Sequence, residues 1–267
     1  MTTLTYAIAD SAVMFRRSLR RILRYPSMTL ILVGMPIVFL LLFVYVLGGT
    51  LGAGLTPTAM GPSGGRADYI AYVIPGILVL TVAAAAQGTA ITVAMDMTEG
   101  IIARFRTMAI ARSAVLAGHV LGSLVQSVGG VAVVLAVSLL IGFRPSAGPV
   151  DWLLATALII LISIAMIWLC VAFGLLTKTV ESASNLPMFL TLLPFFGSGF
   201  VPTESMPVGL RLFAEYQPFT PMIEALRGLL VGAPDAGTVL IAMGWCLVIG
   251  IGGYAWARIL YRRPRVR

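Results

Sequence analysis

The chain has 267 residues, of which 59% are hydrophobic and only 10% are charged, and its mean hydropathy is +1.01. Soluble domains contain roughly 45–50% apolar and about 25% charged residues, so this composition excludes an ordinary soluble domain and indicates a membrane protein. The net charge of +8 comes mainly from arginines that flank apolar runs. Such charges orient a chain in the membrane, and we therefore expect no nucleic-acid partner.

Residues 1–26 predict an amphipathic helix that lies in the membrane interface. With about 100° between successive residues, one face gathers apolar side chains, namely Leu4, Ile8, Ala12, Phe15, Leu19, Ile22 and Leu23. The opposite face gathers five arginines, Arg16, Arg17, Arg20, Arg21 and Arg24. A basic face suits the headgroups of membrane lipids, and Pro26 ends the helix before the chain enters the bilayer. The alternative is a positive-inside signal without a defined helix.

Six apolar runs predict an all-α membrane protein with six transmembrane helices in a single domain over residues 1–267. A helix needs about 20 apolar residues to cross the hydrocarbon. The runs cover residues 28–48, 69–94, 117–142, 152–176, 181–201 and 238–258. The fifth is the least regular, because it contains Pro187 and Pro194 and its apolar stretch is short. The six runs lie within 28–258, and a basic tail follows at 259–267.

The basic residues predict that both termini lie in the cytoplasm. Fourteen of the 18 basic residues fall before the first run, at or after the end of the last, or in the second-to-third and fourth-to-fifth loops. Only Arg66, Arg144, Arg211 and Arg227 fall on the other side. The side richer in Arg and Lys is the cytoplasmic one, so we expect a multi-pass protein of the plasma membrane.

Residues for covalent chemistry are scarce, so we expect no catalytic site, metal or cofactor. The single histidine, His119, has no cysteine or histidine cluster near it in the sequence. The only lysine, Lys178, follows Thr177 and cannot complete a P-loop, so ATP hydrolysis would need another chain. Gln87 and Gln126 are the most polar residues near the middle of the runs. Ion-coupled carriers usually place carboxylates there, which argues against this class.

Two further features concern packing and the loop that follows the second run. Gly118 and Gly122 form a G-x-x-x-G spacing, which we interpret as a place where helices pack closely.

The loop over 95–112 is amphipathic, with an apolar stripe formed by Ile101, Ile102, Phe105 and Met108. A short amphipathic helix at the membrane edge must cover its stripe with lipid, its own bundle or a partner protein.

The segment over 200–230 is too polar to cross the membrane and too apolar to be a free loop. It is broken by prolines and carries charges between Glu204 and Arg227. Short re-entrant or interfacial helices between spans five and six fit this pattern best. Glu224 and Arg227 are three residues apart and could pair on one helix face. The alternative is that these charges only anchor the helices at headgroup depth.

These two segments resemble the type-2 ABC exporter permeases, and within them the daunorubicin-resistance group of drug-export permeases. The resemblance is carried by E-G-I-I-A-R-F-R-T-M at 99–108, with Arg112 after it, and by V-P-T-E-S-M-P at 201–207 with F-A-E-Y-Q-P-F-T-P-M-I-E-A-L-R-G-L-L at 213–230. The first segment departs from the group, because Met108-Ala109 stands where many relatives have Leu-Pro. The resemblance covers nearly the whole chain and implies a bacterial protein.

The resemblance implies a permease that dimerises with a same or paralogous chain and pairs with ABC ATPase subunits, doing no covalent chemistry itself. Residues 1–26 would be the elbow helix. The ATPase-coupling residues would be Asp96, Glu99, Gly100, Ile101, Ile102, Arg104, Phe105, Arg106, Met108 and Arg112. The outer gate and re-entrant residues would be Glu204, Met206, Pro207, Gln217, Pro218, Pro221, Glu224 and Arg227.

The function predicted from these features is ATP-driven export of hydrophobic or amphiphilic compounds, which could be drugs, antibiotics or lipids. One alternative is a permease of the same fold that exports a polysaccharide or another polymer. Another is a membrane protein without transport activity, such as an assembly or immunity factor. A neighbouring gene for an ATPase with a P-loop would separate the first two readings from the third.

Overall fold

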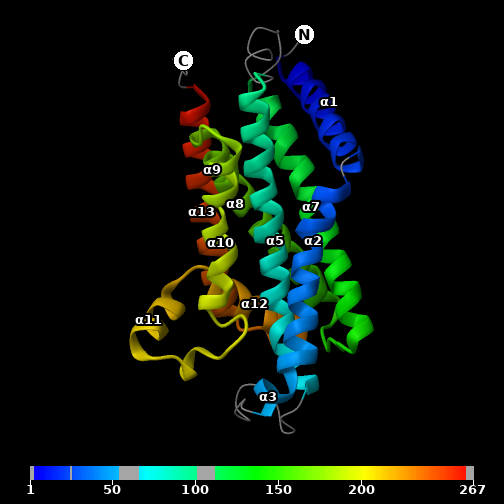
Figure 1. Cartoon of the computed structure of the whole chain (residues 1–267), viewed down its shortest axis with the longest axis vertical. Coiled ribbons are helices and arrows are strands. Elements are labelled where there is room, and N and C mark those ends of the chain that lie inside the picture. The colour runs from blue at the N-terminus through cyan, green and yellow to red at the C-terminus, as the bar shows by residue number, and fades with distance from the viewer. Residues whose placement is uncertain (1–2, 25, 54–65, 101–111, 263–267) are drawn as a thin grey trace.

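The structure, a computed structural model, describes residues 3–24, 26–53, 66–100 and 112–262, and within these ranges it is helical with no strand (Figure 1). The first half contains α1 (Thr3–Arg24), α2 (Pro26–Leu41), the π-helical η1 (Leu42–Leu47), α3 (Gly48–Ala53), α5 (Arg66–Thr98), α7 (Arg112–Ile141) and α8 (Pro149–Leu176). The second half contains α9 (Val180–Asn185), α10 (Met188–Leu192), the short 3-10 helices η2 (Leu193–Phe196) and η3 (Thr203–Ser205), α11 (Val208–Tyr216), α12 (Phe219–Val231) and α13 (Ala236–Arg262).

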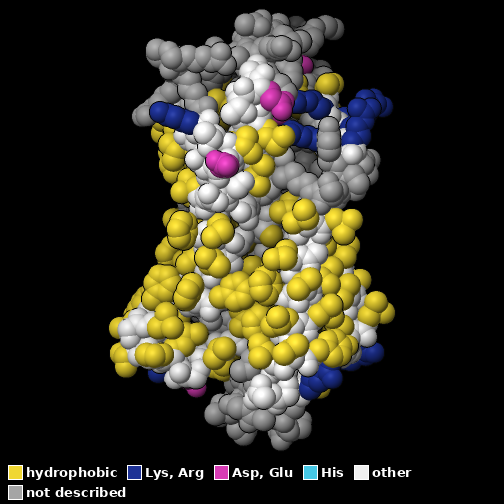
Figure 2. All heavy atoms as spheres, viewed as in Figure 1, with side chains coloured by type: hydrophobic (Ala, Val, Ile, Leu, Met, Phe, Trp, Pro, Cys, Tyr) yellow, Lys and Arg dark blue, Asp and Glu magenta, His cyan; other side chains and the backbone are white. Residues whose placement is uncertain are grey.

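Five helices in the described ranges are long and apolar enough to cross a membrane. They cover Leu30–Thr50, Arg66–Thr98, Leu116–Ile141, Pro149–Leu176 and Ala236–Tyr261, which confirms five of the six predicted runs in place. On the face shown in Figure 2, apolar side chains form a broad belt, whereas charged side chains gather toward the two ends. The belt is the surface expected of a bundle whose solvent is lipid.

The fifth predicted run, 181–201, is not a continuous helix. Because proline has no backbone N–H, the chain breaks at Pro187 between α9 and α10 and tightens into η2 around Pro194. We call the end where α1 begins and α13 ends the terminal end, and the opposite end, with α3 and α11, the distal end. The broken segment leads from α9 near the terminal end toward the distal end (Figure 1).

Helix α5 forms the centre of the bundle and is buried along most of its length. Small residues bring other backbones close to it. A Cβ added at Gly174 of α8 would lie 2.6 Å from the carbonyl oxygen of Ala90 on α5. Helix α13 reaches α8 in the same way, because a Cβ at Gly253 would lie 2.7 Å from the backbone nitrogen of Leu169. Close backbone approach replaces the hydrophobic driving force that is missing between helices in lipid.

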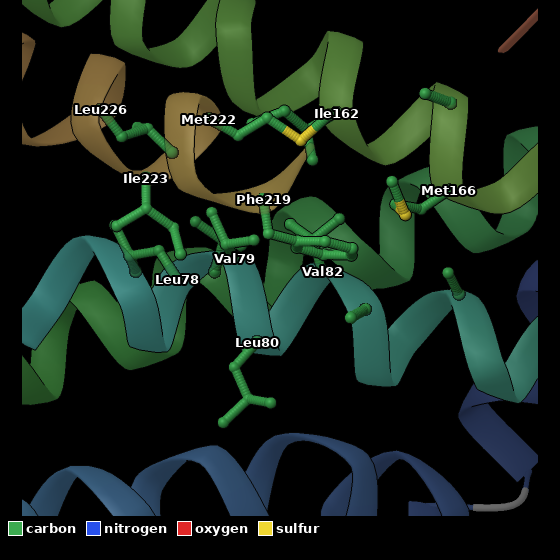
Figure 3. Packing of buried hydrophobic residues seen from close by; sticks show 14 of the residues in the cluster. Leu78, Val79, Leu80, Val82, Ile162, Met166, Phe219, Met222, Ile223 and Leu226 are labelled. Atoms are coloured by element: carbon green, nitrogen blue, oxygen red, sulfur yellow. The ribbon is translucent and has the colours of Figure 1, made fainter. Parts of the chain in front are cut away.

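Helix α12 is wedged between α5, α8 and α13. Its side chains Phe219, Met222, Ile223 and Leu226 are buried, and they face Leu78, Val79 and Val82 of α5 and Ile162 and Met166 of α8 (Figure 3). Leu80 points to the other side of α5, toward α2 (Figure 3). The segment predicted as re-entrant or interfacial therefore contributes to the core through α12, while α11 projects from the bundle (Figure 1).

The turn between α12 and α13 is set by local chemistry. Gly232 ends α12 with a φ of 74°, a left-handed conformation that favours glycine. Asp235 begins α13, because its carboxylate accepts hydrogen bonds from the backbone N–H and the hydroxyl of Thr238, at 2.7 and 2.6 Å. These bonds hold the pKa of Asp235 below its usual range.

Helix α1 lies along α7 at the terminal end (Figure 1). The contact is made at the predicted packing glycines: a Cβ at Gly118 would lie 2.4 Å from the Cβ of Met14, and one at Gly122 would lie 2.6 Å from the Cβ of Ser18. The face of α1 against the bundle is thus the Met14–Ser18 face, which differs from both the predicted apolar face and the predicted basic face.

Candidate functional site

At the terminal end, a buried carboxylate is contacted by two arginines and one histidine. Asp96, near the end of α5, has a side chain that is only 1% exposed. Arg17 Nη2 lies 3.2 Å from its Oδ2, and Arg21 Nη1 lies 3.0 Å from its Oδ1. His119 Nε2 of α7 lies 3.2 Å from Oδ2. Three helices therefore meet at one carboxylate, and we call these four residues the Asp96 cluster.

The cluster corrects one prediction about α1. The five arginines were predicted to share one face suited to lipid headgroups. Arg17 and Arg21 instead donate hydrogen bonds to Asp96. Arg21 also approaches the sulfur of Met95 at 3.6 Å. Arg16, Arg20 and Arg24 are exposed. A buried charge is strongly unfavourable unless it is paired, so Asp96 accounts for the position of the inner two arginines.

The predicted coupling loop begins directly beyond this cluster. Helix α5 ends at Thr98, Glu99 is exposed in the following turn, and Gly100 has a φ of 70° that suits glycine. Arg112 begins α7. The other predicted coupling residues lie outside the described residues; these are Ile101, Ile102, Arg104, Phe105, Arg106 and Met108. Of the coupling candidates whose burial the structure describes, Asp96 is buried, Gly100 is half-buried and Glu99 is exposed.

A second polar site holds α12 at the distal half. Arg227 is half-buried and donates a 2.6 Å hydrogen bond to the carbonyl oxygen of Ser198. Its Nε and Nη2 each lie 3.4 Å from the carbonyl oxygen of Tyr72 on α5. The guanidinium carbon also lies 3.9 Å from the centroid of the Tyr72 ring, which is cation–π distance. One arginine thus joins α12, α5 and the broken segment.

Side-chain donors satisfy backbone carbonyls along the broken segment. Gln87 Nε2 donates to the carbonyl of Ser184 at 2.8 Å, where α9 ends. Gln217 Nε2 donates to the carbonyl of Leu193 at 3.2 Å, and the Tyr69 hydroxyl donates to that of Phe200 at 3.4 Å. Helix breaks inside a membrane protein persist only where neighbouring groups satisfy the freed carbonyls. These residues allow the fifth run to be non-helical.

The remaining predicted outer residues do not converge on one point. Gln217 and Pro221 are buried, and Met206 and Pro218 are half-buried. Glu204, Pro207 and Glu224 are exposed. The predicted pair of Glu224 with Arg227 does not form, because the guanidinium is directed at Tyr72 and Ser198. The ion pair on α11 joins Arg211 Nε and Glu215 Oε1 at 2.6 Å instead.

Several residues of these sites were missed by sequence reasoning. Asp96 was predicted as a coupling residue of the loop, but its burial was not foreseen, although an acidic residue at the end of an apolar run is a signal for a buried partner. His119 and two of the arginines supply that partner. Tyr72 and Ser198 were not predicted, because the hydrogen bonds that they accept from Arg227 go to backbone carbonyls, which every residue type has.

Apolar helices with charged clusters confined to the ends define a multi-pass α-helical membrane protein. The chain belongs to the ABC-2 type transporter family, whose model matches residues 11–231. It is 27% identical over 228 residues to the daunorubicin resistance ABC transporter permease protein DrrB1 of Streptomyces coeruleorubidus, covering 84% of this chain and 77% of that protein. It is 25% identical over 186 residues, 67% of each chain, to the "Probable doxorubicin resistance ABC transporter permease protein DrrC" of Mycobacterium tuberculosis.

Proposed function

We propose that the chain is the permease subunit of an ATP-binding-cassette exporter that moves hydrophobic or amphiphilic compounds, such as drugs, out of a bacterial cell. The family match over residues 11–231 carries this proposal. Relatives named for daunorubicin and doxorubicin resistance favour drug-like cargo over a polymer. The permease acts as a dimer of same or paralogous chains, and separate ATPase subunits hydrolyse ATP.

The distribution of charge supports an external source of energy. No Asp, Glu, Lys or Arg occurs within 69–95, 120–141, 152–176 or 236–257. The polar contacts in the middle of the bundle are neutral, such as the 3.0 Å hydrogen bond between Ser127 of α7 and Ser163 of α8. Proton-coupled carriers place ionisable groups at this depth. Conformational change is therefore driven from the terminal end, where the loop over 101–111 lies between α5 and α7.

In this topology the terminal end is cytoplasmic and the distal end faces outward. The excess of arginines at the terminal end supports the orientation. The broken segment, which leads from one end toward the other, supplies a sixth crossing, and α11 rests at the outer interface. Its side chains Val208, Leu212, Phe213 and Tyr216 are exposed and apolar, which suits the boundary of headgroups and acyl chains.

The experiment that tests the proposal measures the association of the chain with its ATPase. The apolar stripe of 101–108 should insert into a groove on the ATPase, with Glu99, Arg104 and Arg106 at the rim. Buried anchors typically contribute about 2 kcal/mol or more, whereas rim charges contribute less and act mainly on encounter. Phe105→Ala should therefore lower the amount of co-purified ATPase more than Arg106→Ala does.

Both variants must first be shown to insert in the membrane at normal levels. Export of daunorubicin, used as the probe, should fall together with ATPase binding in Phe105→Ala. Full retention of the ATPase by Phe105→Ala, with loss in Arg106→Ala, would show that the contact is electrostatic and that the assigned buried face is wrong. A wild-type chain that binds no ATPase would overturn the proposed function.

A further inference from the structure

The Asp96 cluster lies at the point where the predicted coupling loop leaves and re-enters the bundle. Asp96 is two residues before the end of α5, and the loop follows directly after Gly100. His119 lies two turns into α7, which begins where the loop ends. Both helices that flank the loop are thus attached to the same carboxylate, at 3.2 Å in the case of His119.

The same carboxylate also fixes α1. Arg17 and Arg21 are one turn apart on α1 and reach the two oxygens of Asp96 at 3.2 and 3.0 Å. Next to these ion pairs, Met14 and Ser18 of α1 lie on the glycines of α7. Since the Asp96 side chain is only 1% exposed, a docked ATPase could not touch it. In the described part of the chain it contacts Arg17 and Arg21 of α1 and His119 of α7.

We propose that Asp96 is a positioning residue, a fixed joint that makes α1, α5 and α7 move as one body when the loop over 101–111 is displaced. This inference rests on the proposed function, in which an ATPase displaces that loop. A buried carboxylate cannot exchange its cationic partners for water without a large penalty, so the joint stays closed throughout the cycle. Helix α5 then carries the displacement about 36 Å, over the 24 residues from Asp96 to Tyr72, where Arg227 holds α12.

The first test measures the joint in the absence of any ATPase. Spin labels at Val13 of α1 and Leu121 of α7, both exposed, should give one narrow distance distribution in the otherwise unchanged chain. Asp96→Asn should broaden it, and the conservative Asp96→Glu should keep it narrow. The matched control is Asp151→Asn, which alters an aspartate that accepts a hydrogen bond from Gly148 at the distal end. An unchanged distribution in Asp96→Asn would overturn the proposal.

The second test separates positioning from docking. Asp96→Asn should retain the ATPase and its hydrolysis of ATP, but export per ATP hydrolysed should fall at least about tenfold, since a rigid connection is lost. Asp96→Glu should restore most of that ratio. Loss of the ATPase from Asp96→Asn would indicate that Asp96 contacts the ATPase directly, and it would overturn the proposal. An unchanged ratio of export to ATP hydrolysis in Asp96→Asn would also overturn the proposal.

Two further outcomes are distinguishable. If Asp96→Asn fails to insert, the triple variant Asp96→Asn, Arg17→Gln and Arg21→Gln decides by the same criteria, because it removes the buried carboxylate together with its cationic partners and leaves no unpaired charge. If the wild-type chain binds no ATPase, the proposed function fails, whereas the distance measurement still accepts or rejects the joint.

Discussion

At the scale of single residues, Arg227 acts as a connector and not as one half of a local ion pair. Its guanidinium donates hydrogen bonds to the carbonyl oxygens of Ser198 and Tyr72, and it also lies over the aromatic ring of Tyr72. A planar fork can satisfy these three directions at once, whereas the ammonium of lysine acts as a single point charge. The geometry of the group therefore matters as much as its charge.

We predict that Arg227→Lys lowers the free energy of unfolding in detergent by about 1–3 kcal/mol, because hydrogen bonds from a charged donor contribute about 1.5–3 kcal/mol each and lysine recovers only part of them. The matched control is Arg211→Lys on the exposed helix α11, where the pair with Glu215 is solvent-screened. The control should leave the unfolding midpoint unchanged. Equal effects of the two substitutions would show that Arg227 contributes only charge.

The sequence indicated that Arg227 matters but not what it contacts. A charge in an apolar, proline-broken stretch is unusual, which made Arg227 a candidate. The expected partner, Glu224, was chosen from helical spacing alone, and it is exposed. Tyr72 is 155 positions away and Ser198 is 29 away. Contacts at such separations depend on how the helices pack, which residue spacing does not specify.

At the scale of elements, the contact of α1 with α7 depends on two glycines. We predict opposite effects of alanine on α7. Gly118→Ala should lower the free energy of unfolding by about 1–3 kcal/mol, because its Cβ would lie 2.4 Å from that of Met14 and 3.0 Å from the Met14 backbone. It should also lengthen the distance between labels at Val13 and Leu121. A Cβ added at Gly129 would meet no other atom within 4 Å, so Gly129→Ala should leave the free energy of unfolding unchanged or raise it.

Thermal or denaturant unfolding of both variants in detergent checks this prediction. If Gly118→Ala were as stable as Gly129→Ala and left the label distance unchanged, α1 would not rest on these glycines.

The elements themselves were predictable to different degrees. Five long helices fall within a few residues of their apolar runs, because hydrophobicity over about 20 residues is a local property. The fifth run is interrupted at Pro187 and Pro194, the two prolines that made it the least regular of the six. Its course through the bundle depends on donors such as Gln87 and Gln217, which no local pattern reveals.

The π-helical stretch Leu42–Leu47 was also not foreseen. It lies where Phe43 stacks on Phe200 at 4.5 Å, a contact between distant segments.

At the scale of the whole molecule, the charged side chains described as bonded within the helix bundle form two sites joined by α5. The Asp96 cluster lies at one end and the Arg227 site in the other half, and mainly apolar packing fills the distance between them. In the described ranges, the long helices α5, α7, α8 and α13 carry no charged side chain near their middle on which an ion gradient could act. Under the proposed function, the conformational change begins at the terminal end, at the loop that flanks the Asp96 cluster.

Transport by purified components is the most direct measurement of this mechanism. The chain would be reconstituted in proteoliposomes with and without its ATPase, and movement of a fluorescent amphiphilic drug would be followed after addition of ATP. We expect movement only when the chain, an active ATPase and ATP are all present, with no response to an imposed proton gradient. Movement driven by the proton gradient in the absence of ATP, or ATP-dependent movement by the chain alone, would contradict it.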